Sequence, residues 1–328
     1  MRATESEVNV TRDAPESDIT RGTTHLGVHL RCPRCKACFS DLECVQCGFQ
    51  LREINGILHA LPPERVVHYA RFIEEYERIR DAEGRGSESD DFYLGLPYKD
   101  TSGRNTVQWR IRARTFDYLI QHVLKPQLPS GARILDLGAG NCWMSYRLAL
   151  AGFYPFAVDL LTNDRDGLGA AEHYRKYLPV FFPRLRAELV QLPFLSGQFD
   201  AVVFNASFHY AEDYQSVLHE ALRCIKRGGL VIISDTPWYP SNLSGKRMVS
   251  ERRANFLQRY GTTSASIESL EYLTDEHLSI LEQRLSIDWT IYYPSYGLKW
   301  AMRPILAKLL NRREPARFRV YVAQMASG

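Results

Sequence analysis

An apolar segment that runs directly into a glycine loop sets the fold class of this chain. Residues 134–137 are expected to form a short buried strand in the sequence ARILDLGAGN, and Gly138 and Gly140 follow it. A helix is predicted to begin near Cys142, so that its N-terminus faces the same space as the loop. A strand, a glycine loop and a helix in this order are typical of a parallel α/β sheet that binds a nucleotide-containing ligand.

The glycine loop alone does not identify the ligand, because the binding sites for NAD, FAD and S-adenosylmethionine (SAM) all contain such a loop. A dinucleotide site started at Gly138 would need a third glycine where this chain has Trp143. The next predicted strand ends at Asp159, and an acid at that place accepts hydrogen bonds from ribose hydroxyls. Two further buried strands follow, FDAVVFN and LVIISD, the second after a Gly-Gly turn. These features favour SAM over a dinucleotide.

The order of these motifs resembles the class I SAM-dependent methyltransferases, with a core similar to methyltransferase type 11, over about residues 133–235. The resemblance implies an α/β fold, a Rossmann-like seven-stranded sheet with helices on both faces. It also implies an enzyme that uses SAM as its methyl donor. By this resemblance the cofactor-binding residues are Asp136, Gly138, Ala139, Gly140, Asp159, Leu160, Glu188, Leu189 and Asn205.

Glu188 and Cys142 are two positions at which this chain is compared with the family in detail. Glu188 stands four residues before a Leu-Pro-Phe motif and matches the family's acid near the adenine amine, and Leu189 matches the neighbouring backbone contact. Cys142 is a departure, because the family usually has glycine or another small residue there. The Cys142 thiol is expected either to pack inertly or to lie near the sulfonium.

The fourth predicted strand of the core ends in NASFHY, and in this fold that end lies beside the transferable methyl group. His209 and Tyr210 are therefore the candidate catalytic residues. Imidazole titrates near neutrality, so His209 is a candidate general base. The alternative for both side chains is a role in lining the cofactor or in core packing.

Five of the seven cysteines are clustered between positions 32 and 47. Cys32 and Cys35 form one C-x-x-C knuckle, and Cys44 and Cys47 form another. Two such pairs predict a tetrahedral four-thiolate zinc site, which has no open position and is therefore structural. Cys38 is either a spare thiol or a substitute ligand. Clustered cysteines without an export signal also indicate a reducing, cytoplasmic location.

The cysteine segment resembles the small zinc-ribbon domains that are fused to, or partnered with, bacterial methyltransferases. Their C-P-x-C, C-x-x-C-G and Gly-Ile elements match Cys32-Pro33, the stretch 44–48 and Gly56-Ile57. A looser resemblance, confined to the cysteines, is to the ribbon of some rRNA guanine methyltransferases.

The predicted organisation has four parts: a disordered tail (1–22), a zinc ribbon (23–62), a helical arm or lid (63–128) and a methyltransferase domain (129–328), in which 236–285 and 297–312 are added elements. Within the arm, helices are expected over about 66–79 and 106–124. The aromatic stretch between them predicts a loop that either covers the ligand or packs on the core.

The composition reduces the number of possible functions but does not identify one. A net charge of +3 gives weak support for nucleic-acid binding, and no apolar run is long enough to span a membrane. We expect methyl transfer to an unidentified acceptor, a small molecule or specialised metabolite. The alternatives are an RNA methyltransferase that uses the ribbon and the basic C-terminal region, and a non-catalytic SAM-binding or partner-binding module.

One added element has an unusual composition. The segment 298–310 predicts an apolar helix interrupted by basic residues. It is expected to pack against the zinc ribbon; the alternatives are a partner, phosphate or a membrane surface. The methyl acceptor, the acceptor atom and the oligomeric state are not predicted by the sequence.

Overall fold

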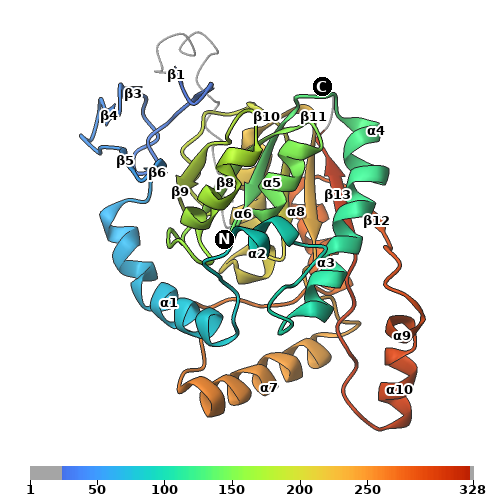
Figure 1. Cartoon of the computed structure of the whole chain (residues 1–328). Coiled ribbons are helices and arrows are strands. Elements are labelled where there is room, and N and C mark those ends of the chain that lie inside the picture. Colours follow the sequence, from blue (N-terminus) through green and yellow to red (C-terminus); the bar gives the residue numbers. More distant parts are fainter. Residues whose placement is uncertain (1–23, 326–328) are drawn as a thin grey trace, which may run out of the picture.

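The computed structural model describes residues 24–325, which fold around one nine-stranded sheet (Figure 1). The predicted tail, 1–22, lies outside the described residues. Each strand is hydrogen-bonded to the next in the following order: β12 (Thr290–Tyr292), β13 (Val320–Gln324), β11 (Ile225–Ser234), β10 (Phe199–Asn205), β7 (Arg133–Leu137), β8 (Tyr154–Asp159), β9 (Arg184–Arg186), β6 (Ile57–His59) and β5 (Arg52–Ile54).

Seven of these strands form the predicted Rossmann-like sheet. Numbered along the chain among themselves, they lie in the order 3-2-1-4-5-7-6 from β9 to β12. The strands from β9 to β11 are parallel, and β13 is antiparallel to both of its neighbours. The order reverses between β7 and β10, which is where open α/β sheets bind ligands beyond the carboxyl ends of their strands.

The predicted strand count was wrong, because the last hairpin of the cysteine-rich segment extends the sheet. β6 pairs in parallel with β9, so that Leu58 lies opposite Leu185, and β5 closes the new edge. Without this hairpin, β9 would expose a row of unpaired backbone groups. The cysteine-rich segment and the core therefore share one sheet.

The remaining strands of the cysteine-rich segment form two small hairpins that also contact the core. β1 (Thr24–His25) pairs with β2 (Val28–His29), and β3 (Phe39–Ser40) pairs with β4 (Glu43–Cys44). Leu30 is buried and bridges to Phe194, and the Arg31 guanidinium binds the Glu220 carboxylate at 3.1 Å. These contacts hold the segment against the body of the molecule.

Helices cover both faces of the sheet, as predicted. Side chains alternate along β7, so Leu135 joins the core on the face of α6 (Tyr214–Cys224), while Ile134 joins the core on the face of α5 (Trp143–Leu150). The other helices on or near these faces are α4 (Lys125–Gln127), α8 (Asp275–Leu285), a π-helical turn (Ile120–Leu124) and a 3-10 helix (Leu168–Tyr177).

The arm consists of α1 (Pro63–Ala82), α2 (Asp90–Gly95) and α3 (Thr106–Leu119). α1 begins with proline in its first turn, where the missing N–H has no intrahelical partner to lose. The expected helices over 66–79 and 106–124 are thus present. The expectation of a loop between them was wrong for α2, because Phe92 and Tyr93 are buried in the core and require an ordered backbone.

The added elements lie around the sheet's carboxyl side. α7 (Asn242–Tyr260) crosses the lower edge of the molecule, and α9 (Leu298–Ala301) and α10 (Arg303–Leu309) project at the lower right (Figure 1). The four-cysteine hairpins lie at the upper left, so the expected packing of 298–310 against the ribbon was wrong. The contact that α9 makes instead is a stack of Trp300 on Phe318, in the segment leading into β13.

Candidate functional site

A cavity of about 370 Å³ lies beyond the carboxyl ends of the parallel strands. Its size falls within the range of roughly 300–1,000 Å³ that is usual for small-molecule clefts. Loops after β7, β8, β9, β10 and β11 form its floor, and residues from α1, α3 and α7 form its walls. The arm therefore lines the cavity through its helices rather than through its aromatic loop.

The glycine loop is packed so closely that a side chain would not fit. Gly138 has a φ of 75°, and a Cβ built there would lie 2.3 Å from the Cβ of Ser207. Gly140 also has a left-handed φ, and its N–H donates to Oδ2 of Asp159 at 2.8 Å. A ligand placed over this loop meets backbone rather than side chains.

Two carboxyl groups lie on the floor of the cavity. Asp159 also accepts a hydrogen bond from the N–H of Leu161, and burial raises its pKa to about 6. Asp136 accepts from the Ser145 hydroxyl at 2.7 Å, and burial raises its pKa to about 7. Both groups are desolvated acceptors, which favours a ligand that supplies hydroxyl or ammonium donors.

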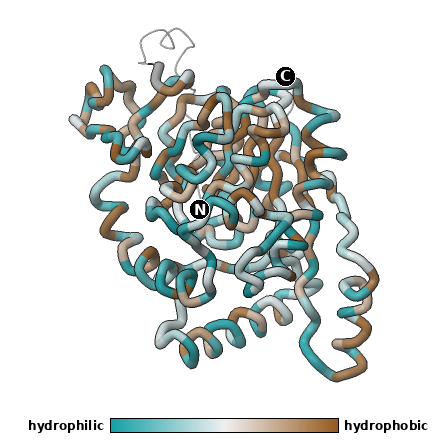
Figure 2. Tube along the Cα trace, in the orientation of Figure 1, coloured by the Kyte–Doolittle hydropathy of each residue, from teal (hydrophilic) through white to brown (hydrophobic). Residues whose placement is uncertain are grey.

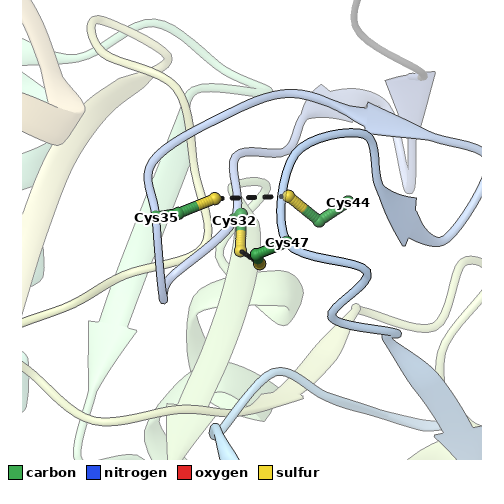
Figure 3. A group of neighbouring side chains, drawn as sticks. All are labelled: Cys32, Cys35, Cys44 and Cys47. Carbon is green, nitrogen blue, oxygen red and sulfur yellow. Dashed lines mark hydrogen bonds between the residues drawn. The ribbon is translucent and has the colours of Figure 1, made fainter.

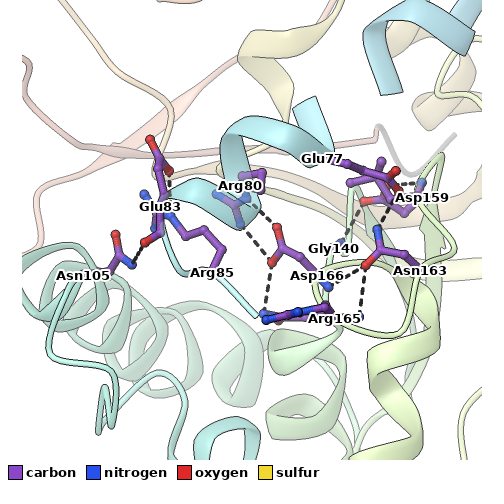
Figure 4. Close-up of polar contacts among 12 residues, drawn as sticks. Glu77, Arg80, Glu83, Arg85, Asn105, Gly140, Asp159, Asn163, Arg165 and Asp166 are labelled. Atoms are coloured by element: carbon purple, nitrogen blue, oxygen red, sulfur yellow. Dashed lines mark hydrogen bonds and ion pairs between the residues drawn. The ribbon is translucent and has the colours of Figure 1, made fainter. Parts of the chain in front are cut away.

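Polar contacts join the arm to the core beside these carboxyl groups (Figure 4). Arg80 on α1 forms a two-pronged ion pair with Asp166, in the loop after β8. One turn earlier on α1, Glu77 accepts from Asn163 at 2.7 Å. Arg80 and Asp166 both line the cavity, so the ion pair that joins the arm to the core also forms part of the cavity wall.

Arg112 is the cation of the wall that lacks a counter-ion. It lies over the Trp109 ring at 4.7 Å, and within residues 24–325 its guanidinium has no hydrogen-bond or ion-pair partner. Burial lowers its pKa to about 10, and the nearby Arg85 and Arg80 lower it further. This partly buried guanidinium has no bonded partner among the described residues, so the wall favours a ligand that brings an anionic group.

The opposite side of the cavity lies at the ends of β10 and β11. Asp235 accepts from the Thr115 hydroxyl at 2.6 Å and from the Asn205 amide at 3.2 Å. His209 lines the same side, and its Nδ1 is buried without a hydrogen-bond partner among the described residues. Burial, followed by Arg252 and Arg112, lowers the pKa of His209 to about 3, so its ring is neutral.

Comparison with known proteins identifies the core. Residues 135–233 match the protein family described as a methyltransferase domain. The centre of this chain is thus similar to a methyltransferase domain, and we call it by that name. An uncharacterized protein of Mycobacterium tuberculosis is 33% identical over 122 residues, which are 37% of this chain and 43% of that protein. A demethylmenaquinone methyltransferase of Clavibacter sepedonicus is 30% identical over 162 residues, covering 49% of this chain and 64% of the relative.

The structural comparison covers more of this chain than the sequence comparisons do. A solved SAM-dependent methyltransferase from Mesorhizobium loti is similar with a TM-score of 0.44 and 19% identity, over 64% of this chain and 99% of that one. The chain spans less than half the length of the first relatives that it matches.

Most of the predicted site residues surround the cavity of the methyltransferase domain. Glu188 does not line it: its carboxylate is fully buried and accepts from Arg65 at 2.6 Å and from the Tyr69 hydroxyl at 3.1 Å. The predicted residues that line the cavity are Asp136, Gly138, Ala139, Gly140, Asp159, Leu160, Leu189, Asn205, His209 and Tyr210.

Sequence reasoning missed several residues of the cavity wall. Asp235 could have been found, since it ends a predicted parallel strand at the same edge as Asp159. Arg80 and Arg112 gave no local signal, because only the packing of α1 and α3 brings them to the cavity. Cys142 packs in the core with a φ of 61° and does not line the cavity.

The two cysteine knuckles converge outside the methyltransferase domain (Figure 3). The sulfur atoms of Cys32, Cys35, Cys44 and Cys47 all lie within 4.8 Å of one another. Cys32 Sγ is 3.6 Å from Cys47 Sγ, and Cys35 Sγ is 3.4 Å from Cys44 Sγ. Cys38 lies outside this group of four.

Proposed function

We propose that the cavity binds SAM and that the protein transfers its methyl group to a small-molecule acceptor. The observation that carries this proposal is the convergence of the glycine loop, Asp159 and the end of β10 on one cavity at the point where the strand order reverses. The methyltransferase family of residues 135–233 supports the same ligand.

The residues fit the chemical groups of the proposed cofactor. Asp159, at the end of β8, is placed to accept from ribose hydroxyls, and Leu160 and Leu189 provide an apolar contact for the adenine. Asp136 faces the amino-acid end, where an ammonium group would satisfy a desolvated carboxyl. Because Arg65 and Tyr69 occupy the carboxylate of Glu188, we assign the adenine side to Leu189 and leave Glu188 out.

The bound cofactor would supply an electrophilic methyl group on a sulfonium. The protein's part is to hold the acceptor in line with that methyl group and to exclude water. An O–H or N–H acceptor also releases a proton. His209 lines the cavity with a neutral ring, to which we assign the role of accepting a hydrogen bond from such a group, and Tyr210 borders it.

A small acceptor is supported by the shape and lining of the cavity. Trp109, Phe256 and Phe318 contribute rings to its walls, which α1, α3 and α7 help to form. These rings suit a planar or apolar molecule. The demethylmenaquinone methyltransferase among the relatives is named for a small molecule.

Two basic residues of the C-terminal region give the RNA alternative no support. Arg313 pairs with Glu251 at 2.8 Å and donates to the Tyr239 hydroxyl. Arg317 lies over the Trp238 ring. These two guanidinium groups are engaged within the protein and are not a free phosphate-binding patch.

We also propose that the four cysteines bind a structural zinc ion. Tetrahedral Zn–S bonds of about 2.3 Å separate the sulfur atoms by about 3.8 Å. The observed pairs at 3.4 and 3.6 Å are close to that spacing. Four thiolates leave no position open for catalysis, and they require a reducing compartment. The ion would hold together the segment whose last hairpin completes the sheet.

The test is transfer of a labelled methyl group. The protein is incubated with methyl-labelled SAM and with cell extract separated into small-molecule, RNA and protein fractions. We expect label in the small-molecule fraction, and none with Asp159→Asn. Label in RNA alone contradicts the proposed acceptor class, and intact SAM binding with no label in any fraction indicates a non-catalytic module.

A further inference from the structure

α9 and α10 form an exposed, apolar helical projection that the proposed function does not use. Neither helix buries a residue. Leu298 is 86% exposed and Leu309 is 76% exposed, although both are large apolar side chains. Figure 2 shows hydrophobic segments alternating with hydrophilic ones along this projection, away from the sheet. An exposed apolar cluster of this kind marks an interaction surface.

Four of the exposed apolar residues lie along one side of the projection, while Leu306 and Leu310, which are 49% and 59% exposed, lie on its flank beside Lys299. Leu298, Met302, Ile305 and Leu309 follow one another at three- and four-residue steps, which places them on a single helical face. The other side is attached to the protein. There Trp300 stacks on Phe318, and Arg303 lies over the Trp300 ring.

The charge of this surface identifies its partner. At 100° per residue, Lys299 and Lys308 fall on opposite flanks of the apolar face, and both are exposed. Arg312 follows and is also exposed. The segment 298–313 contains no acidic residue. An apolar face flanked by free cations is complementary to a bilayer with anionic headgroups, because the apolar side chains enter the interface while the cations reach the phosphates.

A second copy of the chain is a poorer occupant. A two-fold contact places the same surface on both partners, so Lys299, Lys308 and Arg312 would face one another without acids between them.

Among the described residues no helix is long and apolar enough to cross a membrane.

We propose that α9 and α10 dock the protein on an anionic lipid surface. The docked helices would lie next to the cavity, since Phe318 both stacks on Trp300 and lines the cavity. The proposal does not depend on methyl transfer and stands if the catalytic proposal fails.

Co-sedimentation with lipid vesicles tests the proposal on the full chain. Vesicles of phosphatidylcholine with phosphatidylglycerol are compared with vesicles of phosphatidylcholine alone. We expect tighter binding to the anionic vesicles, weakened by salt. Lys299→Gln with Lys308→Gln weakens binding about fivefold per cation.

The apolar contribution is tested separately. Leu298→Ser with Leu309→Ser should weaken binding on the order of a hundredfold, since each leucine that enters the interface contributes roughly tenfold. The matched control is Val67→Ser with Val180→Ser, which changes two residues that are also well exposed, on α1 and in a distant loop, and should bind as the wild type does. The proposal is overturned if wild type and all variants bind vesicles equally, or if wild type does not bind vesicles. It is also overturned if wild type forms a dimer that does not bind vesicles and that the leucine variant dissociates.

Discussion

Replacement of Gly138 by alanine tests the close packing on which the cavity floor depends. Gly138→Ala imposes two separate costs. An L-residue at a φ of 75° costs about 1–2 kcal/mol, and a Cβ placed 2.3 Å from the Cβ of Ser207 adds an overpacking cost of about 1–3 kcal/mol. We expect a loss of about 2–5 kcal/mol in the free energy of unfolding, measured by urea denaturation.

Two further variants separate these costs. Gly131 has a φ of 77° with no atom within 4 Å of the added Cβ, so Gly131→Ala should lose only the backbone cost of about 1–2 kcal/mol. Ser207→Gly removes the opposing Cβ, together with a hydrogen bond from Ser207 Oγ to the carbonyl of Leu137 at 2.5 Å. In the double variant Gly138→Ala/Ser207→Gly the overpacking cost should disappear, giving a coupling energy of about 1–3 kcal/mol. Additive losses, or equal losses for Gly131→Ala and Gly138→Ala, would refute the packing argument.

Three more predictions address the metal, the cofactor and the pH dependence. Cys44→Ser should release about one zinc ion per chain, measured by metal analysis, whereas Cys38→Ser should retain it; retention by both would mean a different ligand set. Asp159→Asn should weaken SAM binding by about 1.5–3 kcal/mol in calorimetry, in protein whose cooperative urea transition shows it to be folded, and unchanged affinity would remove its ribose assignment. Folding lowers the pKa of His209 from 6.5 to about 3, so the unfolded chain binds this proton more tightly. Between those pH values acid should therefore destabilise wild type relative to His209→Gln by up to about 1.4 kcal/mol per pH unit, and parallel stability profiles would contradict this.

Features encoded within a short stretch of sequence were predicted well. The strand–glycine loop–helix unit around Gly138, the acid at the end of β8 and the paired cysteine knuckles each depend on a few consecutive residues whose chemistry is visible in the sequence. The order of these motifs, and the resemblance to class I methyltransferases that it carries, likewise predicted a Rossmann-like sheet. The structure brings ten of the eleven predicted catalytic and cofactor-binding residues to one cavity, the exception being Glu188.

Features that depend on which distant segments meet were not predicted. The pairing of β6 with β9 joins residues far apart in the chain, so the sheet gained two strands that no local pattern indicates. Glu188 is turned away from the cavity by Arg65, a residue of α1. Arg112 faces the cavity because α3 packs across the strand ends. The unpartnered guanidinium of Arg112 is thus a property of the tertiary structure alone.

The most direct test of SAM binding in the cavity is a calorimetric titration of the purified protein with SAM and with its demethylated product. We predict one site per chain with micromolar affinity for both ligands, at about −8 kcal/mol, since the ribose, adenine and amino-acid contacts are common to the two molecules. No heat of binding for either ligand, from a protein whose unfolding transition shows it to be folded, would contradict the proposed function.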